Sequence, residues 1–264
     1  MSEPVKILTI GGTDPCGAYG LYTDLKTFTV LGGHGMGVVT VVTAQNSVGW
    51  YGAEFMRPAF IAQQLDAVLS DYVPAAVKTG FLGRVDVIEV VAQKLRDYAV
   101  PQVVVDTVLV NNHGRPMFGA EVTAAYREHL LPLAQLITPN LWEAAVLLGQ
   151  EIDESVQAAE VLQTQLHPAG AVLLKRAAVS EQITDLFYDG VQLRQLSAPK
   201  IDTRNVSGSG DTLSAAITLF LGRGEPLFEA VQHGRAFTQR ALAAAQTWQL
   251  GQGAGPLGHL QAAG

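Results

Sequence analysis

The chain has 264 residues, a formal net charge of −7 at pH 7 and a single cysteine, Cys16. Hydrophobic residues make up 48% of the sequence, which excludes a disordered chain and supplies enough apolar surface for one extended core. The acidic balance and the absence of any lysine or arginine run argue against a nucleic-acid or anionic-membrane binder. The lone cysteine, with neither a long apolar segment nor a signal-peptide pattern, predicts a soluble cytoplasmic protein.

Apolar runs of strand length alternate with amphipathic segments of helical period along most of the chain. The predicted strands are Val5–Ile10, Met36–Ala44, Ala75–Lys78, Gln102–Asp106, Leu136–Thr138 and Ala171–Lys175. The predicted helices between them are Pro58–Ser70, Val85–Asp97, Ala120–Leu131, Leu141–Leu148 and Glu154–Leu166. This alternation, with continuous apolar strands, predicts an α/β fold whose central sheet is mostly parallel and has helices on both faces.

The pattern changes after the last of these strands. Ile183–Tyr188 and Val191–Leu196 flank the turn dipeptide Asp189-Gly190, which predicts a β-hairpin. Two further helices are predicted over Asp211–Leu221 and Pro226–Thr247. No linker marks a boundary, so we expect one domain over residues 1–264. Because ligands of open α/β sheets bind at the carboxyl ends of the strands, the residues after each strand are the candidate functional residues.

The segment Asn205–Thr212 has the strongest chemical pattern, because Gly208, Ser209, Gly210 and Asp211 lead directly into an apolar helix. Glycines before a helix let backbone N–H groups converge on an anion at the positive end of the helix dipole. Asp211 would there accept a proton from an attacking hydroxyl while the amides hold a phosphoryl group. The alternative is a plain turn in which Asp211 only caps the helix.

A second segment places Asn140 and Glu143 three residues apart at the start of a helix. Together with Asp106 at the end of a strand, they would hold Mg²⁺ against nucleotide phosphates, directly or through waters. The alternative is a capping box, with Asn140 as the cap and Glu143 as its reciprocal partner. Both interpretations can hold together.

Three weaker signals follow other strands. The glycine-dense loop Gly11–Gly20 lets a ligand approach the backbone, although it lacks the dinucleotide-binding fingerprint. Gln45 ends an apolar run where an amide would read the edge of a heterocycle, a plain turn being the alternative. Lys175 ends another strand and is either a phosphate contact or a solvated surface lysine.

Taken in order, several motifs resemble the hydroxymethylpyrimidine kinase family and the related pyridoxal kinases of the ribokinase-like superfamily. These motifs are Gly12–Pro15, Asp24–Phe28, Thr43–Asn46, Lys78–Gly80, Val105–Asp106, Thr138–Glu143 and Gly208–Ala216. The resemblance implies a ribokinase-like α/β fold and Mg²⁺-assisted transfer of the γ-phosphoryl group of ATP to the exocyclic CH₂OH of a nitrogen heterocycle. It also implies a homodimer, because members of the family usually are homodimers.

The resemblance further implies a role for each matching residue. The heterocycle pocket would be lined by Gly12, Asp24, Gln45, Phe81 and Val108. Mg²⁺ would be held by Asp106 and Glu143, and the nucleotide would be bound by Asn140, Lys175 and Ser209. Gly208 and Gly210 would form the anion hole, with Asp211 as the base.

The chain departs from the family pattern at three places. Asp211 stands where the pyrimidine kinases usually carry Cys, and Asp is typical of pyridoxal kinases. Tyr19 and Tyr22 replace small residues of the first loop. Residues 176–178 replace a Gly-Gly-His lid element, in which Arg176 is a candidate hydrogen-bond donor to a phosphate group. Since two anions repel in a low-dielectric site, Asp211 argues against an acceptor that already bears phosphate.

The preferred acceptor is 4-amino-5-hydroxymethyl-2-methylpyrimidine of the thiamin pathway, because the first half of the chain resembles the pyrimidine kinases best; the second phosphorylation, that of the monophosphate, is in question. The alternative is a pyridoxal, pyridoxine or pyridoxamine kinase. A more remote alternative is a ligand-binding homologue without catalytic activity.

Overall fold

The computed structural model describes residues 3–152, 158–166, 168, 170–175 and 181–263. The strands are β1 (Lys6–Thr13), β2 (His34–Asn46), β3 (Gly49–Phe55), β4 (Ala76–Thr79), β5 (Val103–Val105), β6 (Leu136–Ile137), β7 (Ala171–Leu174), β8 (Gln182–Tyr188) and β9 (Leu193–Pro199). The α-helices are α1 (Gly20–Val30), α2 (Pro58–Leu69), α3 (Val85–Asp97), α4 (Ala120–Ala125), α5 (Leu141–Leu148), α6 (Ala158–Leu166), α7 (Ser209–Gly222) and α8 (Leu227–Ala244).

The strands form one sheet in the order β3-β2-β1-β4-β5-β6-β7-β8-β9. Neighbouring strands from β2 to β7 are parallel, whereas β3, β8 and β9 each join the sheet in an antiparallel direction. The predicted mostly parallel sheet and the predicted hairpin are therefore confirmed. The chain moves from β1 to β2 on one side and later returns to β4 on the other, so the strand order reverses beside β1. Open α/β sheets bind their ligands at such a reversal.

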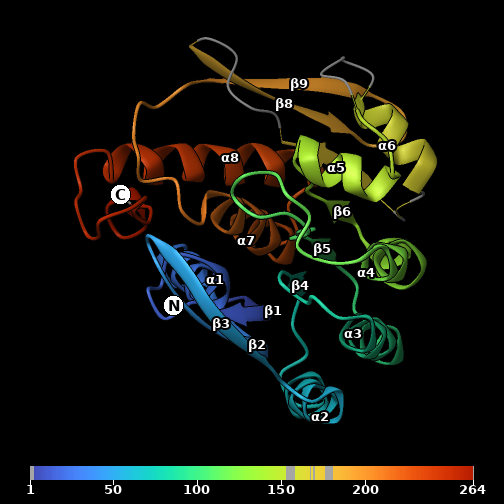
Figure 1. Cartoon of the computed structure of the whole chain (residues 1–264). Helices are drawn as coiled ribbons and strands as arrows, with labels where there is room; N and C mark the ends of the chain where they lie inside the picture. The colour runs from blue at the N-terminus through green and yellow to red at the C-terminus, as the bar shows by residue number, and fades with distance from the viewer. Residues whose placement is uncertain (1–2, 153–157, 167, 169, 176–180, 264) are drawn as a thin grey trace.

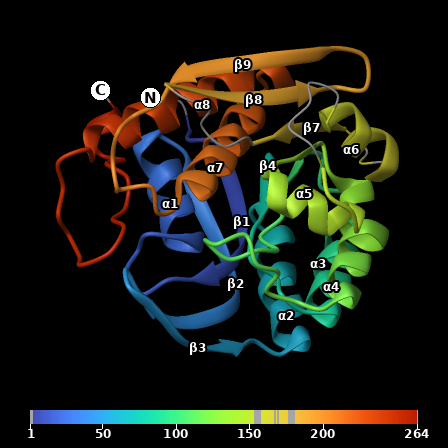
Figure 2. The ribbon, with the colours of Figure 1, turned by 45° about the horizontal axis from the view of Figure 1, so that its top comes forward.

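Helices cover both faces of the sheet, with α1, α7 and α8 on one face and α2 to α6 on the other (Figures 1 and 2). Alternate side chains of each inner strand point to opposite faces. Leu8 and Ile10 of β1 pack into the cluster that includes α2 and α3, while Ile7 packs against α1 and α7. Burial on both faces explains why the inner strands are continuously apolar.

Two elements lack a strong sequence pattern and are absent from the prediction. The first is α1, which begins directly after the glycine loop, and the second is the edge strand β3, whose residues are mostly half-buried or exposed. Because β3 pairs with β2 as far as Asn46, Gln45 lies inside an antiparallel ladder and does not follow a strand end. The predicted strand end at Ala44 is therefore wrong, and so is the alternative of a plain turn at Gln45.

The bounds of two helices differ from the predicted ones. The helix predicted over Ala120–Leu131 is α-helical only to Ala125 and continues as a π-helical segment, Tyr126–Leu130, and a 3₁₀ turn, Leu131–Leu133. The helix predicted from Glu154 is α6, and its first predicted residues lie outside the described residues. Among the described residues, the helices are all too short or too polar to cross a membrane.

Candidate active site

A cavity of about 840 Å³ opens beside β1, at the carboxyl ends of the parallel strands. Its lining includes Gly12 of β1, Gln45 of β2, Phe81 after β4, Val108 after β5 and Asp211 of α7. The fold thus brings four residues predicted to bind the heterocycle together with the predicted base. These residues are far apart in the sequence and meet because parallel strands end at the same edge of the sheet.

One wall of the cavity is aromatic. The ring of Phe81 lies 6.2 Å from that of Trp50, 6.0 Å from that of Phe55 and 5.5 Å from that of Phe118, measured between ring centroids. All four rings line the cavity, together with Gln45. Such a wall accepts a flat ring by offset or edge-to-face stacking, while the amide offers both a donor and an acceptor to the ring edge.

Helix α7 begins at the cavity through a turn that only glycine can adopt. Gly208 has a positive φ of 80°, and a Cβ atom at this position would lie 2.0 Å from the carbonyl oxygen of Ala18. Gly210 lies against Lys175, because a Cβ atom there would be 3.3 Å from the Lys175 Nζ. The first turn of α7 therefore offers free backbone N–H groups and the positive end of its dipole where Asp211 lines the cavity.

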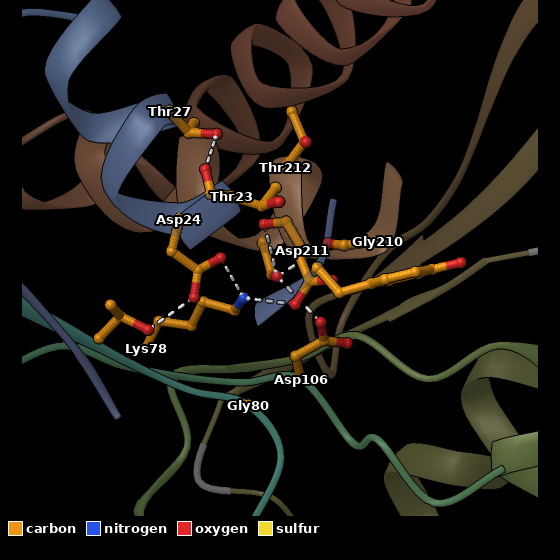
Figure 3. Close-up of polar contacts among 12 residues, drawn as sticks. Thr23, Asp24, Thr27, Lys78, Gly80, Asp106, Gly210, Asp211 and Thr212 are labelled. Atoms are coloured by element: carbon orange, nitrogen blue, oxygen red, sulfur yellow. Dashed lines mark hydrogen bonds and ion pairs between the residues drawn. The ribbon is translucent and has the colours of Figure 1, made fainter. Parts of the chain in front are cut away.

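Beneath Asp211 lies a buried ion-pair network that was not predicted from the sequence (Figure 3). The Lys78 Nζ donates to Asp24 Oδ1 at 2.5 Å and to Asp211 Oδ1 at 3.3 Å. The Thr9 hydroxyl donates to the second oxygen of Asp24 at 2.6 Å. Lys78 is 0% and Asp24 is 1% exposed. A lysine directly after the apolar residues Ala76 and Val77 of β4 is the one sequence signal that could have pointed to this network.

The position of Asp24 corrects its predicted role. Asp24 does not line the cavity, because it lies on the face of α1 that packs against the sheet and is enclosed by Thr9 and Lys78. Burial raises the pKa of Asp24 to about 7, against the opposing charge of Lys78. Burial also lowers the pKa of Lys78, but the carboxylates of Asp24 and Asp211 outweigh this effect and raise it above its usual value. Lys78 is therefore a buried cation.

A second ion pair joins Asp106, which follows β5, to Lys175, which follows β7. The Lys175 Nζ lies 3.2 Å from Asp106 Oδ1, and Asp106 also accepts hydrogen bonds from the hydroxyls of Thr138 and Ser214 at 3.2 and 3.1 Å. Burial opposes the charge on Asp106, but Lys175 and Lys78 outweigh it and hold the pKa of this carboxyl below its usual value. Ser214 belongs to α7, so Asp106 connects the sheet to the helix that carries Asp211.

The capping-box alternative for Asn140 and Glu143 is confirmed. Asn140 Oδ1 accepts the Glu143 N–H at 2.9 Å, and Glu143 Oε2 accepts the Asn140 N–H at 2.9 Å. Thr107 also donates to Glu143 at 3.3 Å. Burial and the nearby Asp106 raise the pKa of Glu143, although Lys175 opposes them. Within the described ranges there is no group of three or more His, Cys, Asp or Glu residues that could hold a metal ion.

Tyr19 ties three loops together at the cavity. The Asp14 carboxylate accepts the backbone N–H groups of Cys16, Ala18 and Tyr19, which fixes the glycine loop. The Tyr19 hydroxyl donates to the Ser207 hydroxyl at 2.9 Å and accepts from the Asn112 amide at 3.2 Å. Tyr19 thus lines the cavity and joins the glycine loop to the loops of Ser207 and Asn112.

Of the other departures from the family pattern, one lies away from the cavity and one lies outside the described residues. Tyr22 is 44% exposed and does not line the cavity. Arg176, with the residues that follow it to 180, lies outside the described residues.

The sequence matches the family described as phosphomethylpyrimidine kinase over residues 14–258. The chain belongs to this family. It is 42% identical over 255 residues to the hydroxymethylpyrimidine/phosphomethylpyrimidine kinase of Rhizobium meliloti (strain 1021), with 96% of each chain covered. It also resembles the crystal structure of an ADP complex of Bacillus subtilis pyridoxal kinase, with a TM-score of 0.90, 32% identity and 98% of each chain covered.

A third relative is the pyridoxal kinase of Staphylococcus aureus in complex with AMP-PCP and pyridoxal. Its TM-score is 0.87 at 30% identity, and the match covers 98% of this chain and 95% of that one. The predictions of a ribokinase-like α/β fold and of a kinase of this family are confirmed by these comparisons.

Proposed function

We propose that this chain transfers the γ-phosphoryl group of ATP to the exocyclic hydroxymethyl group of a flat nitrogen heterocycle. The observation that supports this most is that Asp211, at the start of α7, shares one cavity with Gln45 and the aromatic wall around Phe81. The preferred acceptor is 4-amino-5-hydroxymethyl-2-methylpyrimidine, in line with the name of the Rhizobium meliloti relative.

The reaction needs one proton transfer and one phosphoryl transfer. The acceptor ring stacks against Phe81 with its edge on Gln45, and its hydroxyl reaches Asp211. Asp211 takes the hydroxyl proton while the alcohol oxygen forms a bond to the γ-phosphorus and the bond to the bridging oxygen of ADP breaks. The N–H groups of the turn at Gly208 and Gly210 hold the non-bridging oxygens of the transferred group.

The residues proposed to bind the nucleotide offer hydrogen-bond donors and acceptors to it. Asn140, Lys175 and Ser209 are the candidate nucleotide contacts, and Lys175 lies beside the first turn of α7. Asp106 and Glu143 would hold Mg²⁺, which neutralises phosphate charge when bound. Mg²⁺ usually keeps several waters and uses only one or two carboxylates besides phosphate oxygens, so this pair of acidic residues fits the ion.

The charges around the cavity argue for an acceptor without a phosphate group. Among the described residues that line the cavity, Asp14 and Asp211 are acidic and there is no lysine or arginine. A phosphomonoester would meet the carboxylate of Asp211 with no cation in the lining to balance it. The monophosphate is therefore expected to be a poor acceptor.

Pyridoxal is the second candidate acceptor. Asp211, in place of the Cys usual in pyrimidine kinases, favours it, and the matched structures from Bacillus subtilis and Staphylococcus aureus are named pyridoxal kinases. Its ring is also flat and carries a hydroxymethyl group, so it meets the same aromatic wall.

Steady-state phosphorylation assays with the pyrimidine, its monophosphate and pyridoxal test the proposal. We expect the highest kcat/KM with the unphosphorylated pyrimidine. A much higher value with pyridoxal would reassign the acceptor, and a similar value with the monophosphate would refute the charge argument. Absence of turnover with all three would refute the function itself.

We also propose that the protein is a cytoplasmic homodimer. The exposed edge strand β3 and its turn present Val48, Trp50 and Tyr51, which are 59%, 53% and 66% exposed. Exposed apolar side chains on an edge strand favour pairing with another chain. Sedimentation of the purified protein measures the oligomeric state, and a monomer at micromolar concentration would contradict the proposal.

A further inference from the structure

The reaction proposed above leaves a fully buried cation unused. Lys78 lies in β4, does not line the cavity, and touches one carboxylate on α1 and another on α7 (Figure 3). Its ammonium is also within electrostatic reach of Asp106 at the end of β5. A lysine is rarely fully buried unless it is paired, and one partner, Asp24, would satisfy that need. The contact with Asp211 is therefore additional and needs its own explanation.

The two contacts of Lys78 are unequal. Its Nζ is 2.5 Å from Asp24 but 3.3 Å from Asp211, and Asp24 is itself held by the Thr9 hydroxyl. Asp24 thus anchors the ammonium, and the longer contact holds one oxygen, Oδ1, of the Asp211 carboxylate. A contact at one oxygen limits the rotation of the carboxylate, which would orient the base.

We propose that Lys78, anchored by Asp24, is a positioning residue that orients Asp211 toward the acceptor hydroxyl. The inference rests on the proposed function, because it concerns how the proposed base is prepared. It also gives Asp24 a role in the reaction without contact to the heterocycle. Lys78 and Asp24 act through Asp211 and touch neither the acceptor nor the nucleotide.

Three variants test the inference. Lys78→Met removes the ammonium, Asp24→Asn removes its anchor, and the double variant removes both charges and leaves no buried charge unpaired. Lys94→Met is the matched control, because it removes a partly exposed ion pair with Asp66, in which the Nζ–oxygen distance is 2.7 Å, away from the cavity. The kcat and the KM for each substrate are measured for every variant, with AMP-PCP binding measured by calorimetry.

We expect kcat of Lys78→Met at neutral pH to fall by about 10²-fold, the loss typical of a misplaced catalytic group, while AMP-PCP affinity stays within about threefold. The KM for each substrate likewise stays within about threefold, because Lys78 touches neither substrate. For Asp24→Asn kcat also falls at unchanged AMP-PCP affinity, because the ammonium loses its anchor. A purely structural role would lower stability and leave kcat of the folded enzyme unchanged.

The double variant keeps the test valid if Lys78→Met does not fold. It is expected to fold like the wild type and to keep the low kcat, whereas Lys94→Met keeps wild-type values. Wild-type kcat in Lys78→Met or in the double variant would overturn the inference while the proposed function stands. A wild-type protein without turnover on any acceptor would overturn both, and the parallel wild-type assay separates the two results.

Discussion

His259 contacts the first turn of α7 and makes the free energy of unfolding depend on pH. His259 is 6% exposed, and its Nε2 lies 2.9 Å from the hydroxyl of Thr212, the residue after Asp211. Burial, together with the charge of Lys26, lowers the pKa of His259 to about 4. In the unfolded chain the ordinary value of 6.5 returns. Between these values the unfolded state binds a proton that the folded state does not, so stability is complete above pH 6.5 and is lost as the pH falls toward 4.

The size of this effect follows from the two pKa values. When the pH falls from 7.5 to 4.5, His259 lowers the free energy of unfolding by about 2.5 kcal/mol. The slope is roughly 1.4 kcal/mol per pH unit, but it applies only below the unfolded-state pKa of 6.5. His259→Gln keeps a polar group near Thr212 but cannot titrate, so the variant should lose about 2.5 kcal/mol less than the wild type over this range.

Urea unfolding at the two pH values measures the difference. His233→Gln is the matched control, because His233 is exposed at the surface of α8. Equal losses of unfolding free energy in the wild type and in His259→Gln would refute the argument that burial keeps His259 neutral.

Three further variants test the site itself. Asp211→Asn should lower kcat by about 10²–10⁴-fold and leave AMP-PCP binding nearly intact in calorimetry, and near-normal turnover would assign the base elsewhere. Glu143→Gln keeps an acceptor for the helix cap but loses the charge, so the KM for Mg²⁺-ATP should rise and added Mg²⁺ should partly restore activity. Persistence of the defect at saturating Mg²⁺ would contradict a role in metal binding. Tyr19→Phe loses two hydrogen bonds worth about 1 kcal/mol each, so kcat/KM for the acceptor should fall by about 10- to 30-fold, whereas the exposed Tyr22→Phe should change little.

The parts of the fold that local chemistry determines could be predicted from the sequence. Strands buried on both faces, such as Val103–Val105, are continuously apolar, and Gly208 marks a turn that no residue with a Cβ atom fits. The capping box of Asn140 and Glu143 follows from their spacing of three residues. The resemblance to the family, rather than local chemistry, placed Gly12 and Gln45 in one pocket with Asp211 beside it, and these three residues do line one cavity.

The parts that depend on distant contacts could not be predicted. The edge strand β3 is stabilised by its pairing with β2 and has no apolar alternation of its own. Asp24 of α1 matches a family position. Its neighbours Thr9 and Lys78, however, come from β1 and β4 and enclose it beneath the cavity. The hydrogen bonds of Tyr19 likewise join loops that are almost 200 residues apart along the chain, between Tyr19 and Ser207.

Two lysines lie at the carboxyl edge of the sheet, and the proposed reaction explains the buried one, Lys78, better than stability does. Lys78 and Lys175 both pair with carboxylates there. Burying an ion pair costs desolvation energy that the attraction only partly offsets, and apolar replacement of such pairs is often neutral or stabilising by about 1–4 kcal/mol. Stability alone would therefore favour an apolar side chain at Lys78. In the proposed reaction Lys78 instead orients Asp211, and Lys175 supplies a positive charge beside the N-terminus of α7, where negative charge develops during phosphoryl transfer.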